Sequence, residues 1–363
     1  MSSLDLTADV ATLTEQLVNI ESVSRDERAI ADAVEESLRG LGHLTVTRLG
    51  NNVVARTDLG RNERVVIAGH LDTVPLNDNL PARREPRPDG DLLHGLGTCD
   101  MKGGDAVMLR LAAHVAEPQR DVTFVFYEGE EIDAEFNGLK HLAAADPELL
   151  AADFAILMEP SNAVVEAGCQ GTMRVDVTTR GERARSARSW RGDNAIHKAA
   201  GILARLQDYE ARRPVIDGLE YHEGLNAVFI EGGVAGNVLP DECVVRVNFR
   251  FAPDRSEADA ESFVREFFAG YEVTVTDSAP GALPGLGVPA AKAFVEAVGG
   301  TVNPKFGWTD VARFSALGVP AVNYGPGDPS LAHKQEEHVP VAHIERCEAR
   351  LRAWLGAPAG DHA

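Results

Sequence analysis

The stretch VVIAGHLD, residues 65–72, decides the fold. Its first four residues are apolar and rich in β-branched side chains, a pattern typical of a strand that is buried on both faces. His70 and Asp72 follow directly, where such a strand would end. A buried strand that leads into a histidine and a carboxylate predicts a parallel sheet with chemistry at the carboxyl ends of its strands.

Further apolar runs predict more strands of the same sheet, at 122–126, 154–157 and 321–324. Residues 102–116 follow a glycine-rich turn and predict a helix. The sequence SRDE (24–27) has the capping-box pattern ahead of another amphipathic helix, which we expect to run to Gly40 or Gly42. Buried strands that alternate with helices indicate an α/β domain with a largely parallel central sheet.

The middle of the chain has a different pattern. Alternating apolar residues predict strands at 172–179, 225–231, 243–251 and 271–276, and helical patterns occupy 194–210 and 257–269. This β-α-β-β-α-β order is that of the split ferredoxin-like unit. Because the α/β pattern resumes after the Gly/Pro-rich stretch 280–289, we expect an insertion. The predicted domains are therefore 1–172 with 280–363, and an inserted domain over 173–279.

Composition and charge exclude several classes of protein. The 363 residues include 35 Lys and Arg against 56 Asp and Glu, a formal net charge of −21, which disfavours nucleic-acid or anionic-lipid binding through a general basic surface. No apolar stretch is long enough for a membrane span, and MSSLDLTADV lacks a secretory pattern. The four cysteines form no CxxC pair. We expect a cytoplasmic protein with no nucleic-acid or membrane partner.

Acids and histidines gather after the predicted strands and, for Asp100, at the end of the glycine-rich turn 95–100 just before a helix. They are His70, Asp72, Asp100, Glu130, Glu131, Glu159 and His333. Parallel strands place their carboxyl ends at one edge of the sheet, so these side chains should meet in one crevice. Clustered carboxylates repel one another, and divalent cations remove that repulsion. Two imidazoles with carboxylates suit zinc, and cobalt or manganese would also fit.

The spacing within two of these motifs suggests roles. In an extended chain, His70 and Asp72 point to the same side, so Asp72 can accept the free N–H of the imidazole and hold its tautomer. The side chains of Glu130 and Glu131 diverge because the residues are adjacent. One of the two can bind metal while the other acts as a general base.

These motifs resemble a known superfamily. AGHLDTVP (68–75), GTCDMKGG (97–104), EGEE (128–131), MEP (158–160) and AHKQEEH (332–338) resemble the di-zinc aminoacylase/carboxypeptidase superfamily of metallopeptidases. The likeness runs nearly end to end. It implies a zinc-peptidase-like α/β catalytic domain with a mostly parallel central sheet, an inserted ferredoxin-like lid that also forms the dimer, and hence a homodimer.

The resemblance implies a set of metal ligands. Asp100 would bridge two Zn²⁺ ions, His70 and Glu159 would complete one site, and Glu131 and His333 would complete the other. Co²⁺ or Mn²⁺ could replace zinc.

The resemblance also implies three features around these ligands. Asp72 would be the partner of His70. Glu130 would take a proton from the bridging water and later protonate the leaving amine. The peptide bond between Asp100 and Met101 would be cis.

Longer segments narrow the resemblance. EAGCQGTMRV (166–175), SARSWRGDNAIHK (186–198), NFRFAP (248–253) and KFGWTDVARF (305–314) resemble the actinobacterial members that hydrolyse N-succinyl-L,L-2,6-diaminopimelate to succinate and L,L-diaminopimelate in lysine and diaminopimelate biosynthesis. The expected substrate is therefore a small anionic N-acyl amino acid. The substrate contacts that this implies are Arg250, Asn237, Arg185, Arg188, Gly307 and Thr309.

Arginines crowd into one part of the inserted domain. Arg183, Arg185, Arg188 and Arg191 lie within nine residues, and guanidinium groups bind carboxylates in a bidentate way. Arg185 departs from the family pattern G-x-x-x-H-S-A-R, which has histidine at this position. In the family that histidine reaches the partner subunit's active site and helps to hold the oxyanion.

Two alternatives remain open from the sequence. One is a sibling di-zinc deacylase or peptidase that acts on acetylornithine, another N-acyl amino acid or a dipeptide. The other is a weakly active metal-binding homologue, which the arginine at position 185 favours and the complete ligand set opposes.

Overall fold

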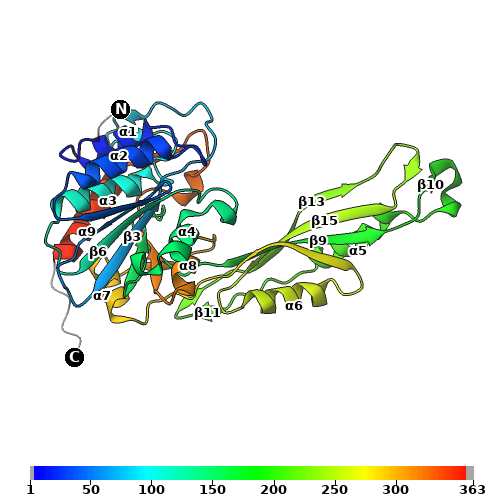
Figure 1. Cartoon of the computed structure of the whole chain (residues 1–363). Coiled ribbons are helices and arrows are strands. Elements are labelled where there is room, and N and C mark those ends of the chain that lie inside the picture. The colour runs from blue at the N-terminus through cyan, green and yellow to red at the C-terminus, as the bar shows by residue number, and fades with distance from the viewer. Residues whose placement is uncertain (1–3, 357–363) are drawn as a thin grey trace. The chain divides into compact units, whose positions relative to one another are not determined.

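A computed structural model describes residues 4–356, which form two compact units (Figure 1). Unit 1 comprises Met1–Ala167, Pro284–Asn303 and Arg313–Ala363, and unit 2 comprises Gly168–Leu283 and Pro304–Ala312. Unit 2 thus extends a few residues beyond the expected 173–279 and takes up the segment 304–312, which we had expected in the catalytic domain. The reason is local bonding: Trp308 Nε1 donates to Pro280 O at 3.0 Å, and Cys169 Sγ lies 3.7 Å from Thr309 O.

The core of unit 1 is an eight-stranded sheet in the order β1-β2-β6-β3-β7-β18-β8-β17. The strands are β1 Thr45–Leu49, β2 Asn52–Arg56, β3 Arg64–His70, β6 Asp121–Tyr127, β7 Phe154–Leu157, β8 Val165–Ala167, β17 Val302–Pro304 and β18 Ala321–Asn323. The four central strands β6, β3, β7 and β18 are parallel, and β2 and β8 pair with them antiparallel on either side. The sheet is therefore mixed with a parallel centre, and β3 and β6 are almost entirely buried, as their apolar sequences predict.

The helices of unit 1 cover this sheet. They are α1 Val10–Val18, α2 Arg28–Arg39, α3 Lys102–His114, α4 Gly138–Ala145, α7 Pro289–Ala297 and α9 Val341–Gly356, with one-turn helices at Ala134–Phe136, Pro147–Leu149 and Pro329–Leu331. The short helix α8 Val311–Ala316 begins in unit 2 and ends in unit 1. α3 packs against both α1 and α9, and the three lie on one side of the sheet in Figure 1. No helix within residues 4–356 is long and apolar enough to cross a membrane.

A small three-stranded sheet, in the order β19-β5-β4, completes unit 1. Its strands are β4 Arg83–Glu85, β5 Leu92–His94 and β19 His338–Pro340. β19 pairs with β5 antiparallel, with His338 opposite His94. This pairing joins two distant segments of the chain, the one before the glycine-rich turn and the one after His333.

Unit 2 contains a four-stranded antiparallel sheet in the order β13-β15-β9-β16. The elements are β9 Gly171–Arg180, β10 Ala184–Arg185, a one-turn segment Ser186–Arg191, α5 Ala195–Gln207, β11 Val215–Ile216, β12 Leu219–Glu220, β13 Gly224–Gly232, β14 Val238–Leu239, β15 Glu242–Phe251, α6 Glu257–Phe267 and β16 Glu272–Ala279. The main elements follow one another as β9-α5-β13-β15-α6-β16, a βαββαβ order. Alternate apolar residues of β9 and β15 pack against Ala199 of α5 and Val264 of α6, so both helices cover the same face of the sheet.

One local prediction is wrong. Residues 24–27 do not form a capping box: α2 begins at Arg28 with Glu27 as its N-cap, and no side chain caps the helix. Ser24 Oγ instead donates to the Asp72 carboxylate at 2.7 Å. A capping box lies at the start of α6, where Ser256 and Asp259 bond each other's backbone N–H.

Candidate metal centre

Unit 1 places three of the five predicted metal ligands, His70, Glu131 and Glu159, at or just beyond the ends of its parallel strands. His70 is the last residue of β3 and lies opposite Tyr127, the last residue of β6. Glu130 and Glu131 follow β6, and Glu159 follows β7 by two residues. The parallel register therefore brings side chains from distant parts of the sequence to one edge of the sheet.

Four of the five predicted ligands make direct contacts. Asp100 Oδ1 lies 3.1 Å from His70 Nε2, and Asp100 Oδ2 lies 3.3 Å from His333 Nε2. His333 Nε2 is also 3.0 Å from Glu131 Oε1. Within the described residues, His70, Asp100 and Glu131 form the group of potential metal ligands, with donor atoms within 4.8 Å of one another. The two oxygens of Asp100 thus face two different imidazoles, which is the disposition of a bridging carboxylate.

Glu159 and Glu130 lie close enough to affect this cluster. Glu159 is 6% exposed, and its charge, like that of Glu130, favours the protonated form of His70. Glu130 is partly buried and is held through its backbone N–H, which donates to Asp72.

Asp72 accepts hydrogen bonds from several groups besides its expected partner, His70. His70 Nδ1 lies 3.0 Å from the main-chain oxygen of Asp72 and 3.6 Å from its carboxylate, so the imidazole N–H donates to the carbonyl instead. The carboxylate accepts the backbone N–H groups of Glu130 at 3.0 Å and Glu131 at 3.1 Å, together with the Ser24 hydroxyl. One fully buried side chain thereby fixes the loop that carries both adjacent glutamates.

The close packing of these groups shifts the pKa values of His70, His333 and Glu131. Burial disfavours a charged imidazole at His70, but hydrogen bonds to Asp100 and Asp72 outweigh it and hold the pKa of His70 well above its usual value. Hydrogen bonds to Asp100 and Glu131 raise the pKa of His333 to about 10. Burial raises the pKa of Glu131, and the neighbouring Asp100 charge adds to this effect.

The turn that carries Asp100 has a backbone feature implied by the resemblance. The peptide bond between Asp100 and Met101 is cis. The turn ends at α3, whose residues 102–109 are all buried. Asp100 is therefore attached to a helix that packs into the core of unit 1.

One residue of this region was missed in the sequence. Glu337 lies in AHKQEEH, four residues after His333, and is 1% exposed. Its Oε1 accepts the backbone N–H groups of Cys99 and Asp100 at 3.0 and 3.1 Å. A second acid in a glutamate pair is an ordinary surface pattern, so the sequence offered no signal for this contact.

The donor set fits divalent cations. Two imidazole nitrogens and several carboxylate oxygens converge within a few ångströms, and imidazole with carboxylate ligands suits zinc and its neighbours among the transition metals. The exposed side of the cluster is at His333, whose side chain is 51% exposed. Solvent or a substrate can therefore reach the donors from this side.

The predicted substrate contacts all belong to unit 2. Arg185 on β10 pairs with Val238 on β14, and the Ser186 N–H donates to Asn237 O at 2.9 Å, so two of these residues are neighbours. Arg188 is exposed in the segment between β10 and α5.

A hollow of about 500 Å³ in unit 2 collects other predicted contacts. Arg250 and Gly307 line it together with Thr172, Arg174 and Asn248. Burial lowers the pKa of Arg250, and its Nη1 has no hydrogen-bond partner among the described residues. Thr309, two residues after Gly307 in the sequence, is buried. Its hydroxyl likewise lacks a hydrogen-bond partner within residues 4–356.

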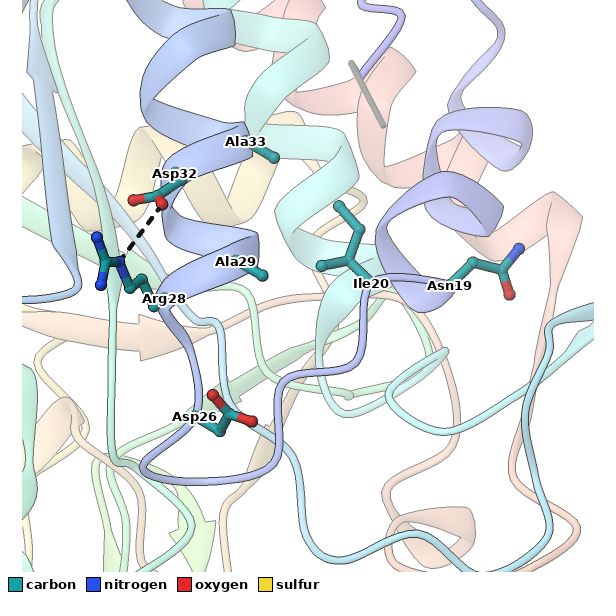
Figure 2. A pocket seen from close by; sticks show the side chains of 7 residues that line it. All are labelled: Asn19, Ile20, Asp26, Arg28, Ala29, Asp32 and Ala33. Carbon is teal, nitrogen blue, oxygen red and sulfur yellow. Dashed lines mark ion pairs between the residues drawn. The ribbon is translucent and has the colours of Figure 1, made fainter. Parts of the chain in front are cut away.

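Another hollow, of about 470 Å³, lies between the end of α1 and the start of α2 (Figure 2). Asn19, Ile20, Asp26, Arg28, Ala29, Asp32 and Ala33 line it. Its charged side chains include the surface ion pair of Arg28 with Asp32, at 3.8 Å. None of the predicted site residues takes part, so we assign no chemistry to it.

Comparisons with known proteins agree with this geometry. A succinyl-diaminopimelate desuccinylase of Corynebacterium glutamicum is 49% identical over 97% of each chain. A Mycobacterium tuberculosis protein, whose own assignment as such a desuccinylase is provisional, is 56% identical over 97% of this chain and 99% of its own. The crystal structure of a tripeptidase from Staphylococcus aureus matches with a TM-score of 0.78 at 22% identity, covering 98% of this chain and 99% of its own. The model of peptidase family M20/M25/M40 matches residues 66–356, and the chain belongs to that family.

Proposed function

We propose that the protein is a metal-dependent amidohydrolase that cleaves N-succinyl-L,L-2,6-diaminopimelate to succinate and L,L-diaminopimelate in lysine and diaminopimelate biosynthesis. The observation that carries this proposal is near-complete coverage at 49% identity to a named desuccinylase, combined with a cluster of imidazoles and carboxylates in contact. The four cysteines are free and buried, which is consistent with a cytoplasmic enzyme.

The proposed cofactor is a pair of Zn²⁺ ions. Asp100 would hold both, because its two oxygens face different imidazoles. His70 with Glu159, and His333 with Glu131, would complete the two sites. When bound, the cations would supply Lewis acidity toward the substrate's amide carbonyl and toward water.

The remaining steps fall to side chains of this chain. Glu130 would accept a proton on its carboxylate from the attacking water and return it to the leaving nitrogen of the amide. Asp72 would support this step by accepting the backbone N–H of Glu130 at 3.0 Å, which restrains the main chain from which the Glu130 side chain extends. Because its Nδ1–H donates to the Asp72 carbonyl, His70 would present Nε2 to a metal that displaces the proton from that nitrogen.

Unit 2 would recognise the substrate's carboxylates. Arg250 is the best candidate, because its side chain is partly buried and its Nη1 has no partner within residues 4–356, so a carboxylate in this polar hollow could accept from it. Gly307 lines the same hollow, and the unpaired hydroxyl of Thr309 could donate to a carboxylate oxygen. Asn237, Arg185 and Arg188 remain proposed contacts from the resemblance alone.

A homodimer through the lid is also part of the proposal. β13 is an edge strand, and its residues Val228, Phe229 and Ile230 are at least 50% exposed. α5 packs against β13 and exposes Ile196 and Leu203. An apolar edge strand beside an apolar helix face is a surface that a second copy of the chain would cover.

The first test compares substrates. With zinc supplied, we expect the protein to release succinate from N-succinyl-L,L-diaminopimelate with a kcat/KM at least about 100-fold above that for N-acetylornithine or a dipeptide. Buried polar groups in a carboxylate pocket would be left unpaired by the uncharged acyl groups. An equal or higher kcat/KM with acetylornithine would replace the proposed activity with that of a sibling deacylase.

A second test uses the protons held by the cation-free cluster. With its pKa raised to about 10, the His333 imidazole is protonated at pH 7.5, and the pKa of His70 is raised as well, so a cation must displace protons from the cluster. Zinc binding should therefore release protons, and the apparent affinity should rise with pH up to about 10, the pKa of His333. Titration calorimetry in two buffers of different ionisation enthalpy measures the release. Identical heats in the two buffers would contradict this account.

A third test concerns Glu130. Glu130→Gln should retain bound zinc but lose about 10²–10⁴-fold in kcat, because an amide cannot accept the proton of water. Glu128→Gln is the matched control in the same loop: its amide oxygen can still accept from the Asn51 backbone, so kcat should not change. Near-normal turnover of Glu130→Gln with full metal content would assign the base elsewhere.

A fourth test concerns the arginine that replaces the family histidine. A cationic and longer side chain is a poor substitute for an imidazole that donates to the oxyanion, and one such donor is typically worth about 10²–10³-fold in kcat. We expect Arg185→His to raise kcat at least about tenfold with a smaller change in KM. Arg183→His is the control, since Arg183 already bonds Asp241 at 2.7 Å. An unchanged or lower kcat in Arg185→His would mean that Arg185 itself serves the oxyanion.

A further inference from the structure

Glu337 joins two segments that carry proposed metal ligands. Its Oε1 accepts the consecutive backbone N–H groups of Cys99 and Asp100, and its main-chain oxygen accepts the N–H of Gly95 at 3.1 Å. Its own N–H donates to Lys334 O at 3.2 Å, which closes the loop directly after His333. Side chain and backbone of one buried residue therefore contact the turn of Asp100 and the loop of His333 together.

We propose that Glu337 is a positioning residue for the metal centre, which sets the position of Asp100 relative to His333. The proposal rests on the metal-dependent function put forward above. It assigns Glu337 no contact with substrate and no proton transfer.

The sheet next to the cluster explains why one residue can couple these segments. β5 ends at His94, just before the glycine-rich turn, and β19 begins at His338, just after Glu337. Because His338 lies opposite His94, the Glu337 side chain reaches the turn from the same end of the strand pair. A shift of either strand would move the turn and the loop together.

The hydrogen bonds that Glu337 accepts restrain the backbone that carries Asp100. Two neighbouring N–H groups next to buried residues need acceptors, and a carboxylate is a stronger acceptor than a neutral group. Rotation of the backbone at Asp100 would move a carboxylate whose two oxygens contact different imidazoles at 3.1 and 3.3 Å. Metal ligands tolerate displacements of only about 0.5 Å before binding suffers.

The same device occurs a second time around the cluster. Asp72 accepts the consecutive backbone N–H groups of Glu130 and Glu131, as Glu337 accepts those of Cys99 and Asp100. The loops that carry Asp100 and Glu131 thus each rest on a buried carboxylate that accepts two adjacent N–H groups. This repetition separates the contact from an incidental hydrogen bond.

A matched control distinguishes positioning from stability alone. Asp121 is 3% exposed and accepts the backbone N–H groups of Leu59 and Arg61, each at 2.8 Å. It lies at the start of β6, whereas the cluster lies at the ends of the strands, about 20 Å away for a seven-residue strand. Asp121→Ala therefore removes a similar anchor far from the metal.

The experiment is a Co²⁺ titration of cation-free protein, followed by visible absorption, because the spectrum reports ligand geometry independently of turnover. We expect Glu337→Ala to weaken Co²⁺ binding about 10–100-fold and to change the spectrum, as for other outer partners of metal ligands. Glu337→Gln, which keeps an oxygen acceptor, should restore most of the affinity. Asp121→Ala should lower the thermal midpoint while leaving affinity and spectrum at wild-type values.

The outcomes separate this inference from the proposed function. Wild-type affinity and spectrum in Glu337→Ala would overturn the positioning role while leaving the metal centre intact. Failure of the wild-type protein to bind Co²⁺ would overturn the metal centre, and this inference with it. If Glu337→Ala does not fold, Glu337→Asp withdraws the carboxylate by one methylene, and unchanged Co²⁺ affinity in that variant would equally overturn the role.

Discussion

The sharing of one carboxylate between two imidazoles is the interaction on which the site depends. Asp100 contacts His70 through one oxygen and His333 through the other, and these histidines are more than 260 residues apart in sequence (70 and 333). Without a cation, the carboxylates favour the protonated form of both imidazoles, whose pKa values they raise. Divalent cations can take over that balance, so the fold gathers groups whose mutual repulsion calls for a positive charge.

A parallel sheet brings ligands to one edge, but it does not by itself place them to the accuracy that metal binding requires. The loops beyond the strand ends have freedom that the sheet cannot remove. Asp72 and Glu337 supply the missing restraint, since each buried carboxylate accepts two consecutive N–H groups of a loop. The strand ends therefore bring His70, Glu131 and Glu159 together, and hydrogen bonds to Asp72 and Glu337 restrain the loops that carry Glu131 and Asp100.

The sequence predicted those parts of the fold that depend on local pattern. The apolar run 65–68 became β3, and the alternation at 243–251 became β15, because burial on both faces or on one face leaves a direct periodic signal. Ser24 was misassigned because a capping box and a hydroxyl that bonds a distant carboxylate have the same local sequence. Glu337 was missed for a related reason: its partners lie more than 230 residues away, and no local pattern records such a contact.

The arginines of unit 2 differ in whether a carboxylate of the protein already binds them, a difference that amino-acid composition does not reveal. Arg183 bonds Asp241 at 2.7 Å and Arg174 bonds Asp277 at 2.9 Å, so protein carboxylates already neutralise both. Arg250 is more buried, and no described residue accepts from its Nη1. A surface ion pair contributes little, whereas a buried N–H without an acceptor, such as that of Arg250 Nη1, costs free energy until an anion accepts from it. Of the arginines considered from the sequence, Arg250 is therefore the one whose surroundings favour an anionic substrate most strongly.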